Sequence, residues 1–223
     1  MEGHDDAPEQ RPIYPVTVAI PAAMEERNRL TVAFRFILAL PHIILVGGPA
    51  AIITCSGWGS DDSWTWGSGS GLLGVVAFFA AFIAWFAILI TREHPDGLWK
   101  LAAYYMRWRV RAGAYLMLLR DEYPPFGDDP YPAELVLTKP EEPRDRVTVL
   151  LRLLLAIPHF VLLWLLSLAW GFTTAIAWVM ILFTGRYPET LYGFAIGVFA
   201  WTVRVEAYVL LLRDEYPPFT LRV

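Results

Sequence analysis

Residues 27–42 read RNRLTVAFRFILALPH, and residues 144–159 read RDRVTVLLRLLLAIPH. Nine of these sixteen positions are identical at a constant offset of 117 residues. Each stretch opens with two arginines and then becomes apolar up to a Pro-His pair. Self-similarity at a fixed offset is the signature of an internal repeat, so we expect two copies of one structural unit.

A second pair of matching stretches follows at a different offset. Residues 85–126 and 178–219 are identical at 21 of 42 positions, and both end in LLRDEYPPF at an offset of 93. The fall in offset from 117 to 93 gives the first copy 24 extra residues. These centre on residues 55–71, CSGWGSDDSWTWGSGSG, whose glycines and serines favour a flexible loop.

The two copies divide the chain into three parts. Residues 1–13 are polar and acidic, lack the basic start and apolar core of a signal peptide, and are expected to form a disordered tail. The first repeat covers residues 14–126 with its insert at 55–71, and the second covers residues 131–219.

The composition points to a membrane protein. Of the 223 residues 56% are hydrophobic and 18% are charged, and the mean hydropathy is +0.43. Soluble domains carry about 25% charged residues. A net charge of −4 argues against a nucleic-acid-binding protein, which needs a basic face. Cys55 is the only cysteine, which excludes an intramolecular disulfide and a cysteine-rich zinc site.

Each repeat is expected to begin with a short exposed strand, at residues 16–20 and 134–138. Pro15 directly precedes the first segment, and Pro132 lies two residues before the second. Residues 219–221, after the final Pro-Pro pair, are expected to pair with one of these strands.

Apolar stretches of spanning length follow the strands. Residues 30–54 and 72–91 each offer about 20 spanning residues. Residues 147–184 form one run, which as a single helix would be about 57 Å long and nearly twice the bilayer core. We therefore expect a hairpin of two helices broken near residues 167–171. The alternative is an interfacial helix before Pro158 and one spanning helix after it.

A further helix is expected at residues 98–120 and again at 191–213. In the first copy Lys100, Arg107 and Arg111 fall within about 40° of each other around the helix. A basic stripe among many aromatic residues is typical of a helix on the membrane surface, which we favour over a spanning helix. The second copy is more apolar, so spanning stays open there.

The pattern resembles the bacterial membrane family called domain of unknown function 4389. Its marks are a Pro-His pair at 158–159, TGRYP at 184–188 and DEYPPF at 214–219. The first copy departs from the pattern at residues 91–95, TREHP, and in its long insert. The resemblance covers nearly all of residues 14–219. It implies an actinobacterial-type inner-membrane protein with no assigned activity and no catalytic residues to carry over.

Polar residues within the apolar stretches are the candidate contacts for lipid or a partner. Each histidine follows a proline. We expect it to lie at the membrane interface or to bond the carbonyl group that the proline leaves without a partner. The alternatives are a proton relay and metal binding. The matched Arg-Tyr pairs, spaced i and i+4, suit lipid headgroups or snorkelling. The candidates are His42, His159, Arg111, Arg204, Tyr115, Tyr208 and Glu206.

Glu206 is the exception to the repeat, because Gly113 occupies the matched position. A carboxylate there needs a basic partner, for which Arg111 and Arg152 are the candidates, or contact with water. We expect a basic group or a water-filled pocket around Glu206 in place of lipid.

No motif for chemistry is present. The sequence contains no GxxxxGK phosphate loop, GxGxxG, GxSxG or HExxH, so we expect no enzyme, no cofactor and no metal. The prediction is an all-α integral membrane protein with minor β structure. Each of its two repeats would consist of a short strand, a membrane helical hairpin and an amphipathic or interfacial helix.

The expected role follows from this reading. We expect a structural or accessory protein that binds lipid, another membrane protein or a second copy of itself, and no nucleic acid. The alternative is a small transporter or channel with its site at the repeat interface. Basic residues flank the insert on both sides, which predicts a multi-pass protein of the inner (plasma) membrane with both termini in the cytoplasm.

Overall fold

The computed structural model describes residues 14–21, 27–48 and 71–222. The tail over residues 1–13 and all of the insert except Gly71 lie outside the described residues. The elements in chain order are β1 (Val16–Ala19), α1 (Arg29–Ala33), α2 (Arg35–Val46), α3 (Gly71–Thr91), α4 (Asp96–Leu116), β2 (Glu134–Leu137), α5 (Arg146–Thr184) and α6 (Glu189–Val209).

Helix α5 is one continuous helix of 39 residues, so both expectations for this stretch are wrong. There is no hairpin near residues 167–171, and the helix runs through Pro158 without a break. A proline inside a helix removes one hydrogen bond and costs about 3 kcal/mol. Nine buried side chains spaced three, four or seven residues apart form one stripe along α5. Packing of this stripe along the whole length compensates for the proline.

The first repeat contains the same helix in an interrupted form. At offsets of 117 and 93, α1, Phe34, α2 and α3 match α5 residue for residue, with Val46 matching Leu163 and Gly71 matching Trp164. Residues 47–70 are the 24 without a counterpart. The helix expected over residues 30–54 therefore ends earlier, at Val46. The insert joins the chain at the point that corresponds to the middle of α5.

The two predicted strands exist, and they pair with each other. β1 and β2 form a two-stranded antiparallel sheet in which Val18 lies opposite Leu135. These two residues are themselves matched at the offset of 117. Residues 219–221 were expected to pair with a strand, but they form no strand in the structure. The sheet is therefore shared equally between the repeats.

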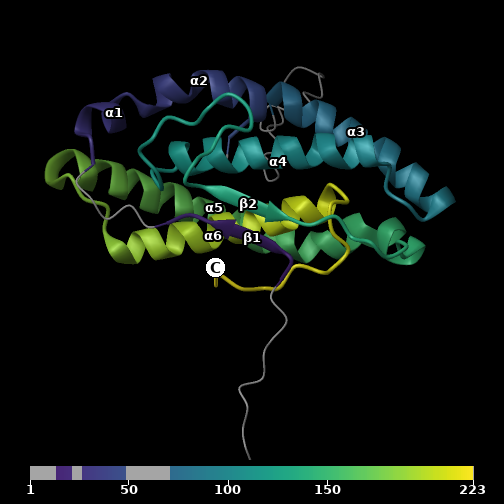
Figure 1. Ribbon diagram of the computed structural model, residues 1–223. Helices are drawn as coiled ribbons and strands as arrows, with labels where there is room; N and C mark the ends of the chain where they lie inside the picture. The colour runs from purple at the N-terminus through teal and green to yellow at the C-terminus, as the bar shows by residue number, and fades with distance from the viewer. Residues whose placement is uncertain (1–13, 22–26, 49–70, 223) are drawn as a thin grey trace, which may run out of the picture.

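Helices α4 and α6 form a middle layer (Figure 1). The sheet covers them on one side, and the long helices α1 to α3 and α5 pack against them on another. Thirteen residues of α4 and fourteen of α6 are buried. Other parts of the chain therefore cover most of these two helices, and their position relative to a membrane stays a prediction.

Each repeat forms a backbone hydrogen bond with the other repeat through the arginine just before its long helix. The backbone N–H of Arg27 donates to the carbonyl oxygen of Gly185 in the second repeat at 2.8 Å. The backbone N–H of Arg144 donates to the carbonyl oxygen of Arg92 in the first repeat at 2.9 Å. Arg27 matches Arg144, and Arg92 matches Gly185, so the two contacts are reciprocal.

Two tryptophans repeat this exchange. The indole N–H of Trp85 donates to the carbonyl oxygen of Val149 at 3.1 Å, and that of Trp178 donates to Val32 at 3.0 Å. Each tryptophan thus reaches across to the long helix of the other repeat. The reciprocal contacts tie the two copies into one body.

Candidate functional site

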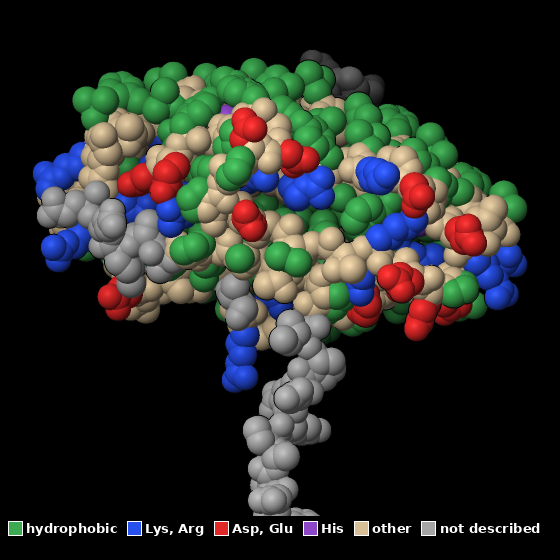
Figure 2. Space-filling model, viewed as in Figure 1, with side chains coloured by type: hydrophobic (Ala, Val, Ile, Leu, Met, Phe, Trp, Pro, Cys, Tyr) green, Lys and Arg blue, Asp and Glu red, His purple; other side chains and the backbone are tan. Residues whose placement is uncertain are grey.

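A large apolar face is the main surface feature of the molecule. Large hydrophobic side chains are exposed along α1, α2, α3 and α5, whereas α4 and α6 contribute none among the described residues. Phe183, Phe172 and Ile90 are 78%, 74% and 73% exposed. In Figure 2 hydrophobic side chains cover the edge formed by α1 to α3, while acidic and basic side chains gather over the front, where the strands lie.

Helices α3 and α5 contain almost no charged residues. α3 contains no charged residue, and α5 contains none after Arg152, which is itself buried. The hydroxyl groups of Ser167, Thr173 and Thr184 donate to carbonyl oxygens of the same helix. Polar groups satisfied within their own helix do not need water. By length and composition, α3 and α5 could each cross a membrane.

An ionic layer lies behind the apolar face, built around the terminal motif of each repeat. Arg152 on α5 donates to the carbonyl oxygens of Tyr208 and Arg213 and to the carboxylate of Asp214. Its guanidinium carbon lies 4.5 Å from the centre of the Tyr208 ring. This layer anchors the DEYPPF segment to the long helix.

The first repeat builds the same arrangement with matched residues. Arg35 donates to the carbonyl oxygens of Tyr115 and Arg120 and to Asp121, and lies over the Tyr115 ring at 4.6 Å. Both arginines are 1–2% exposed. The sequence pairs these tyrosines with Arg111 and Arg204 one turn away, but the guanidinium groups that lie over their rings are those of Arg35 and Arg152.

A second arginine completes each carboxylate site. Arg27 lies 2.9 Å from Asp121, and Arg144 lies 2.5 Å from Asp214. Burial acts to raise the pKa of Asp214, but Arg144 and Arg152 outweigh it and hold that pKa below its ordinary value. Each aspartate is therefore paired with two buried arginines.

The two histidines sit in matched aromatic cages. The Nδ1 of His42 accepts a hydrogen bond from the indole of Trp108, and that of His159 accepts one from Trp201, both at 3.1 Å. Each ring also stacks on the phenylalanine of a DEYPPF segment, with ring centres 4.5 Å and 4.1 Å apart. The partner is thus an indole, not the carbonyl that a proline frees.

These cages give no sign of metal binding. His42 and His159 are 1% and 0% exposed. Over residues 14–21, 27–48 and 71–222 no cluster of histidine, cysteine, aspartate or glutamate could hold a metal ion. The histidine rings fix the ends of the two repeats.

Arg111 and Arg204 clamp the segments that follow the Pro-Pro pairs. Arg111 donates to the carbonyl oxygen of Gly127 at 2.6 Å, and Arg204 donates to those of Thr220 and Arg222 at 3.4 Å and 2.7 Å. The two arginines are 7% and 5% exposed. The structure thus gives both guanidinium groups partners inside the chain, and contact with headgroups stays a prediction.

Glu206 meets a basic group, as predicted, although the partner is neither Arg111 nor Arg152. Its carboxylate lies 2.6 Å from the Nε of Arg109 and accepts a hydrogen bond from Tyr105 at 3.1 Å. Arg109 also donates to the carbonyl oxygen of Val46. The pair joins α4 to α6 across the repeat boundary.

Close packing explains the residue that matches Glu206. A side chain at Gly113 would place its first carbon 2.8 Å from the ring of Phe199 on α6. The middle helices therefore approach too closely for a carboxylate at that position. The departure from the repeat is dictated by the crossing of α4 and α6.

A buried histidine at the polar end of α3 was not singled out by the sequence. His94 is 5% exposed and lines an open groove of about 830 Å³ between residues 91–96 and 138–144. Its Nδ1 lies 3.1 Å from the carbonyl oxygen of Pro95, and its Nε2 has no partner among the described residues. Burial lowers the pKa of His94 to about 4. The matched residue, Tyr187, is buried in the same way.

The contacts of the ionic layer were also not predicted from the sequence. Arg35, Arg152, Asp121 and Asp214 are all repeat-matched, and so are the indoles of the histidine cages. Conservation between the two copies was the available signal. Arg35 and Arg152 show this conservation as clearly as the residues of α4 and α6 do.

Comparison with known proteins agrees with this reading of the repeats. No curated protein and no solved structure matches the chain. The model of the family described as Domain of unknown function (DUF4389) matches residues 69–127 and again residues 146–220. The two matches correspond to two tandem copies of one domain, and the chain belongs to the DUF4389 family.

Proposed function

We propose that this protein is an integral membrane protein with a structural or accessory role, and that the apolar face of α1 to α3 and α5 contacts lipid. The observation that carries the proposal is the segregation of exposed side chains. Every charged residue of α5 lies in its first seven residues, and α3 has none. Soluble monomers rarely expose apolar patches larger than a few hundred Å².

The polar groups support a structural role over transport. The transporter alternative needs His159, Glu206 and Arg111 to converge in one water-accessible cavity. These three side chains have separate partners, and each is 7% exposed or less. The contacts of the buried arginines and of the two caged histidines within the chain stabilise one arrangement of the helices, which favours a structural role.

The proposed location is the inner membrane, with both termini in the cytoplasm. Its support is the distribution of basic residues, which are concentrated in the ionic layer and on the front face (Figure 2). Basic residues near membrane segments are retained on the cytoplasmic side. The front face then lies in the cytoplasm, where a partner protein or a second copy of the chain could bind.

Matched aspartate substitutions test the lipid contact. Phe172 on α5 is 74% exposed, and Val136 on β2 is 52% exposed. On a water-facing surface both Phe172→Asp and Val136→Asp would be tolerated. In lipid an aspartate at the centre of a helix costs about 2.5–3.5 kcal/mol.

We expect Phe172→Asp to reduce the amount of protein that resists carbonate extraction from membranes, and Val136→Asp to leave it unchanged. Recovery of the unmodified protein in the soluble fraction would refute the proposal. So would equal behaviour of the two variants.

A further inference from the structure

We propose that α5 and its interrupted counterpart α1 to α3 lie along the membrane within one leaflet, and that both ends of α5 face the same aqueous compartment. This inference rests on the proposed contact of the apolar face with lipid. It goes beyond that contact because length and composition alone are equally consistent with α5 crossing the bilayer.

The first step is a twofold relation between the repeats. In the antiparallel sheet, Val18 lies opposite Leu135, and these residues occupy the same position in the two repeats. Opposed residues in an antiparallel pair are related by a local twofold axis perpendicular to the sheet, because their side chains point to the same side. The axis therefore passes between Val18 and Leu135.

The second step places the two ends of α5 at one depth along this axis. A twofold rotation leaves depth along its axis unchanged, so Arg27 and Arg144 are equally deep, and so are Arg92 and Gly185. Arg27 and Gly185 are in direct contact through a hydrogen bond of 2.8 Å, so they lie at about the same depth. All four residues therefore lie at one level along the axis. Arg144 precedes α5 and Gly185 follows it, so the helix begins and ends at the same level.

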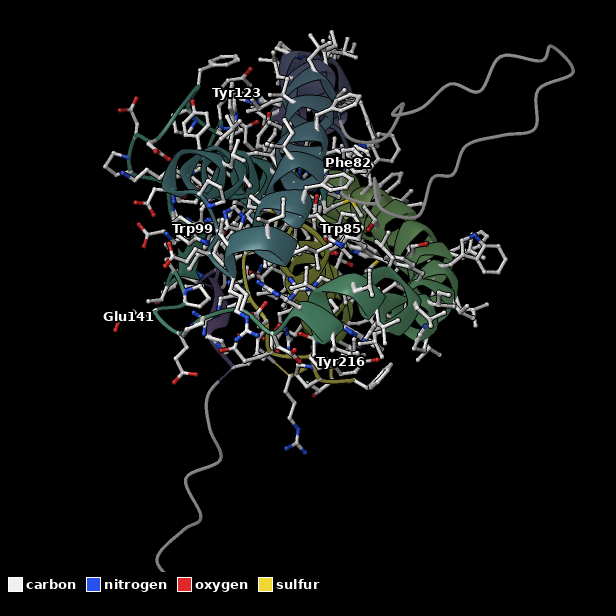
Figure 3. All side chains as sticks on the ribbon, turned by 90° about the vertical axis from the view of Figure 1, so that its right-hand side faces the viewer. Phe82, Trp85, Trp99, Tyr123, Glu141 and Tyr216 are labelled. Atoms are coloured by element: carbon white, nitrogen blue, oxygen red, sulfur yellow. The ribbon has the colours of Figure 1, made fainter. Side chains whose placement is uncertain are left out.

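The third step orients the axis in the membrane. One end of the axis leaves the molecule through the outer side of the sheet, where Glu134 is exposed. The loop after β2 adds Glu141 and Glu142, which are also exposed. Figure 3 shows Glu141 at the edge of the molecule, away from Phe82 on the apolar helix α3. Acidic side chains are strongly disfavoured in hydrocarbon, so this end of the axis points to water and the axis runs along the membrane normal.

The length of α5 agrees with this orientation. A helix of 39 residues is about 58 Å long, against a hydrocarbon core of about 30 Å. To fit the core, a crossing helix of this length would have to tilt beyond the range of about 0–40° seen in membrane proteins. A helix that lies in one leaflet has no such limit and can be exposed and apolar over its full length.

Cysteine accessibility tests the orientation directly. The background is Cys55→Ser in the full chain, and single cysteines replace Glu142 before α5 and Thr190 after it, both of which are exposed. Cysteine at Phe172, within the apolar face, is the matched control. Each variant is treated with a membrane-impermeant maleimide in intact cells, after lysis, and after denaturation in detergent.

The proposal expects the Glu142→Cys and Thr190→Cys variants to be labelled alike, both only after lysis, and Phe172→Cys to be labelled only after denaturation. Labelling of one end in intact cells and of the other only after lysis would show that α5 crosses the bilayer and would overturn the proposal. That result leaves the lipid contact intact. Loss of the protein from the membrane fraction would instead refute the proposed function.

Discussion

The carboxylate of Glu206 lies 2.6 Å from the Nε of Arg109, so a residue peculiar to the second repeat is paired with a residue of the first. The side chains are 6% and 3% exposed. At the matched positions stand Gly113 and Thr202, which cannot form the same pair. The ion pair is therefore the point at which the two copies have specialised.

Neutralising Glu206 should destabilise the protein. Glu206→Gln leaves the Arg109 guanidinium buried without its carboxylate, and breaking a buried pair from one side costs about 3–5 kcal/mol. We expect a clearly lower unfolding temperature for the protein in mild detergent. Glu134→Gln, on the exposed side of the sheet, is the control and should change little. Equal and negligible effects would mean that Glu206 behaves as a solvated residue.

Lysine should not replace the arginines of the ionic layer. Arg35 and Arg152 each bond two carbonyl oxygens and a carboxylate, which a compact ammonium group cannot do in the same geometry. Arg35→Lys and Arg152→Lys should each lose about 2–3 kcal/mol in unfolding free energy. The exposed Arg29→Lys serves as the control. A large effect in only one repeat would show that the matched contacts are not equivalent.

His94 should make stability fall in mild acid. The folded protein keeps this histidine neutral down to about pH 4, whereas an unfolded chain takes up the proton near pH 6.5. The contribution is therefore complete above about pH 6.5 and is lost progressively as the pH falls toward 4, up to about 3 kcal/mol. His94→Phe should flatten this part of the curve of unfolding free energy against pH. An unchanged slope in the variant would assign the effect to other groups.

The insert should be dispensable for folding. Val46 and Gly71 correspond to the neighbours Leu163 and Trp164, and Gly71 already lies against the backbone of Leu45. Joining Val46 directly to Gly71 should give one 39-residue helix in place of α1, Phe34, α2 and α3. Circular dichroism should show no loss of helix, and the unfolding temperature should not fall. A deletion variant that aggregates would show that residues 47–70 help to hold the two helices in place.

The labelling of Cys55 distinguishes a one-leaflet orientation of α1 to α3 from a helical hairpin that crosses the bilayer. The insert contains no lysine or arginine, whereas Arg35 precedes it and Arg92 follows it. In the one-leaflet orientation an impermeant maleimide should label Cys55 only after lysis, whereas the positive-inside rule applied to two crossing helices would place the insert outside. Labelling of Cys55 in intact cells would therefore contradict the one-leaflet orientation. A cysteine at Gln10 in a Cys55→Ser chain should be labelled only after lysis. Labelling at Gln10 in intact cells would reverse this topology.

The repeats and their elements could be predicted because they depend on local pattern. Both strands, the positions of the long apolar helices and the following helices were readable from proline, charge and hydropathy. The continuous helix over residues 147–184 was not predicted. A hairpin was expected there because a single helix is longer than the bilayer is thick. That inference assumed a helix that crosses, and a helix running along a surface is free of that limit.

The partners in the buried layer depended on tertiary structure. Arg109 and Glu206 are 97 residues apart, and only the crossing of α4 and α6 at Gly113 brings them together. The repeat drew attention to Glu206, which has Gly113 at the matched position, but it did not point to Arg109 as its partner. The importance of the matched arginines Arg35 and Arg152 could have been predicted, because both belong to the stretch that shows the duplication.

The exchanged contacts also bear on a chain that has only one copy of this domain. Its first arginine would find no carbonyl at the position of Gly185, its strand no neighbour, and its tryptophan no long helix to bond. Two such chains could supply these contacts to each other across a symmetric interface. The present protein holds both sides of such an interface in a single polypeptide. A single chain keeps the two copies in equal number and allows them to differ in sequence, as they do at Glu206 and Gly113.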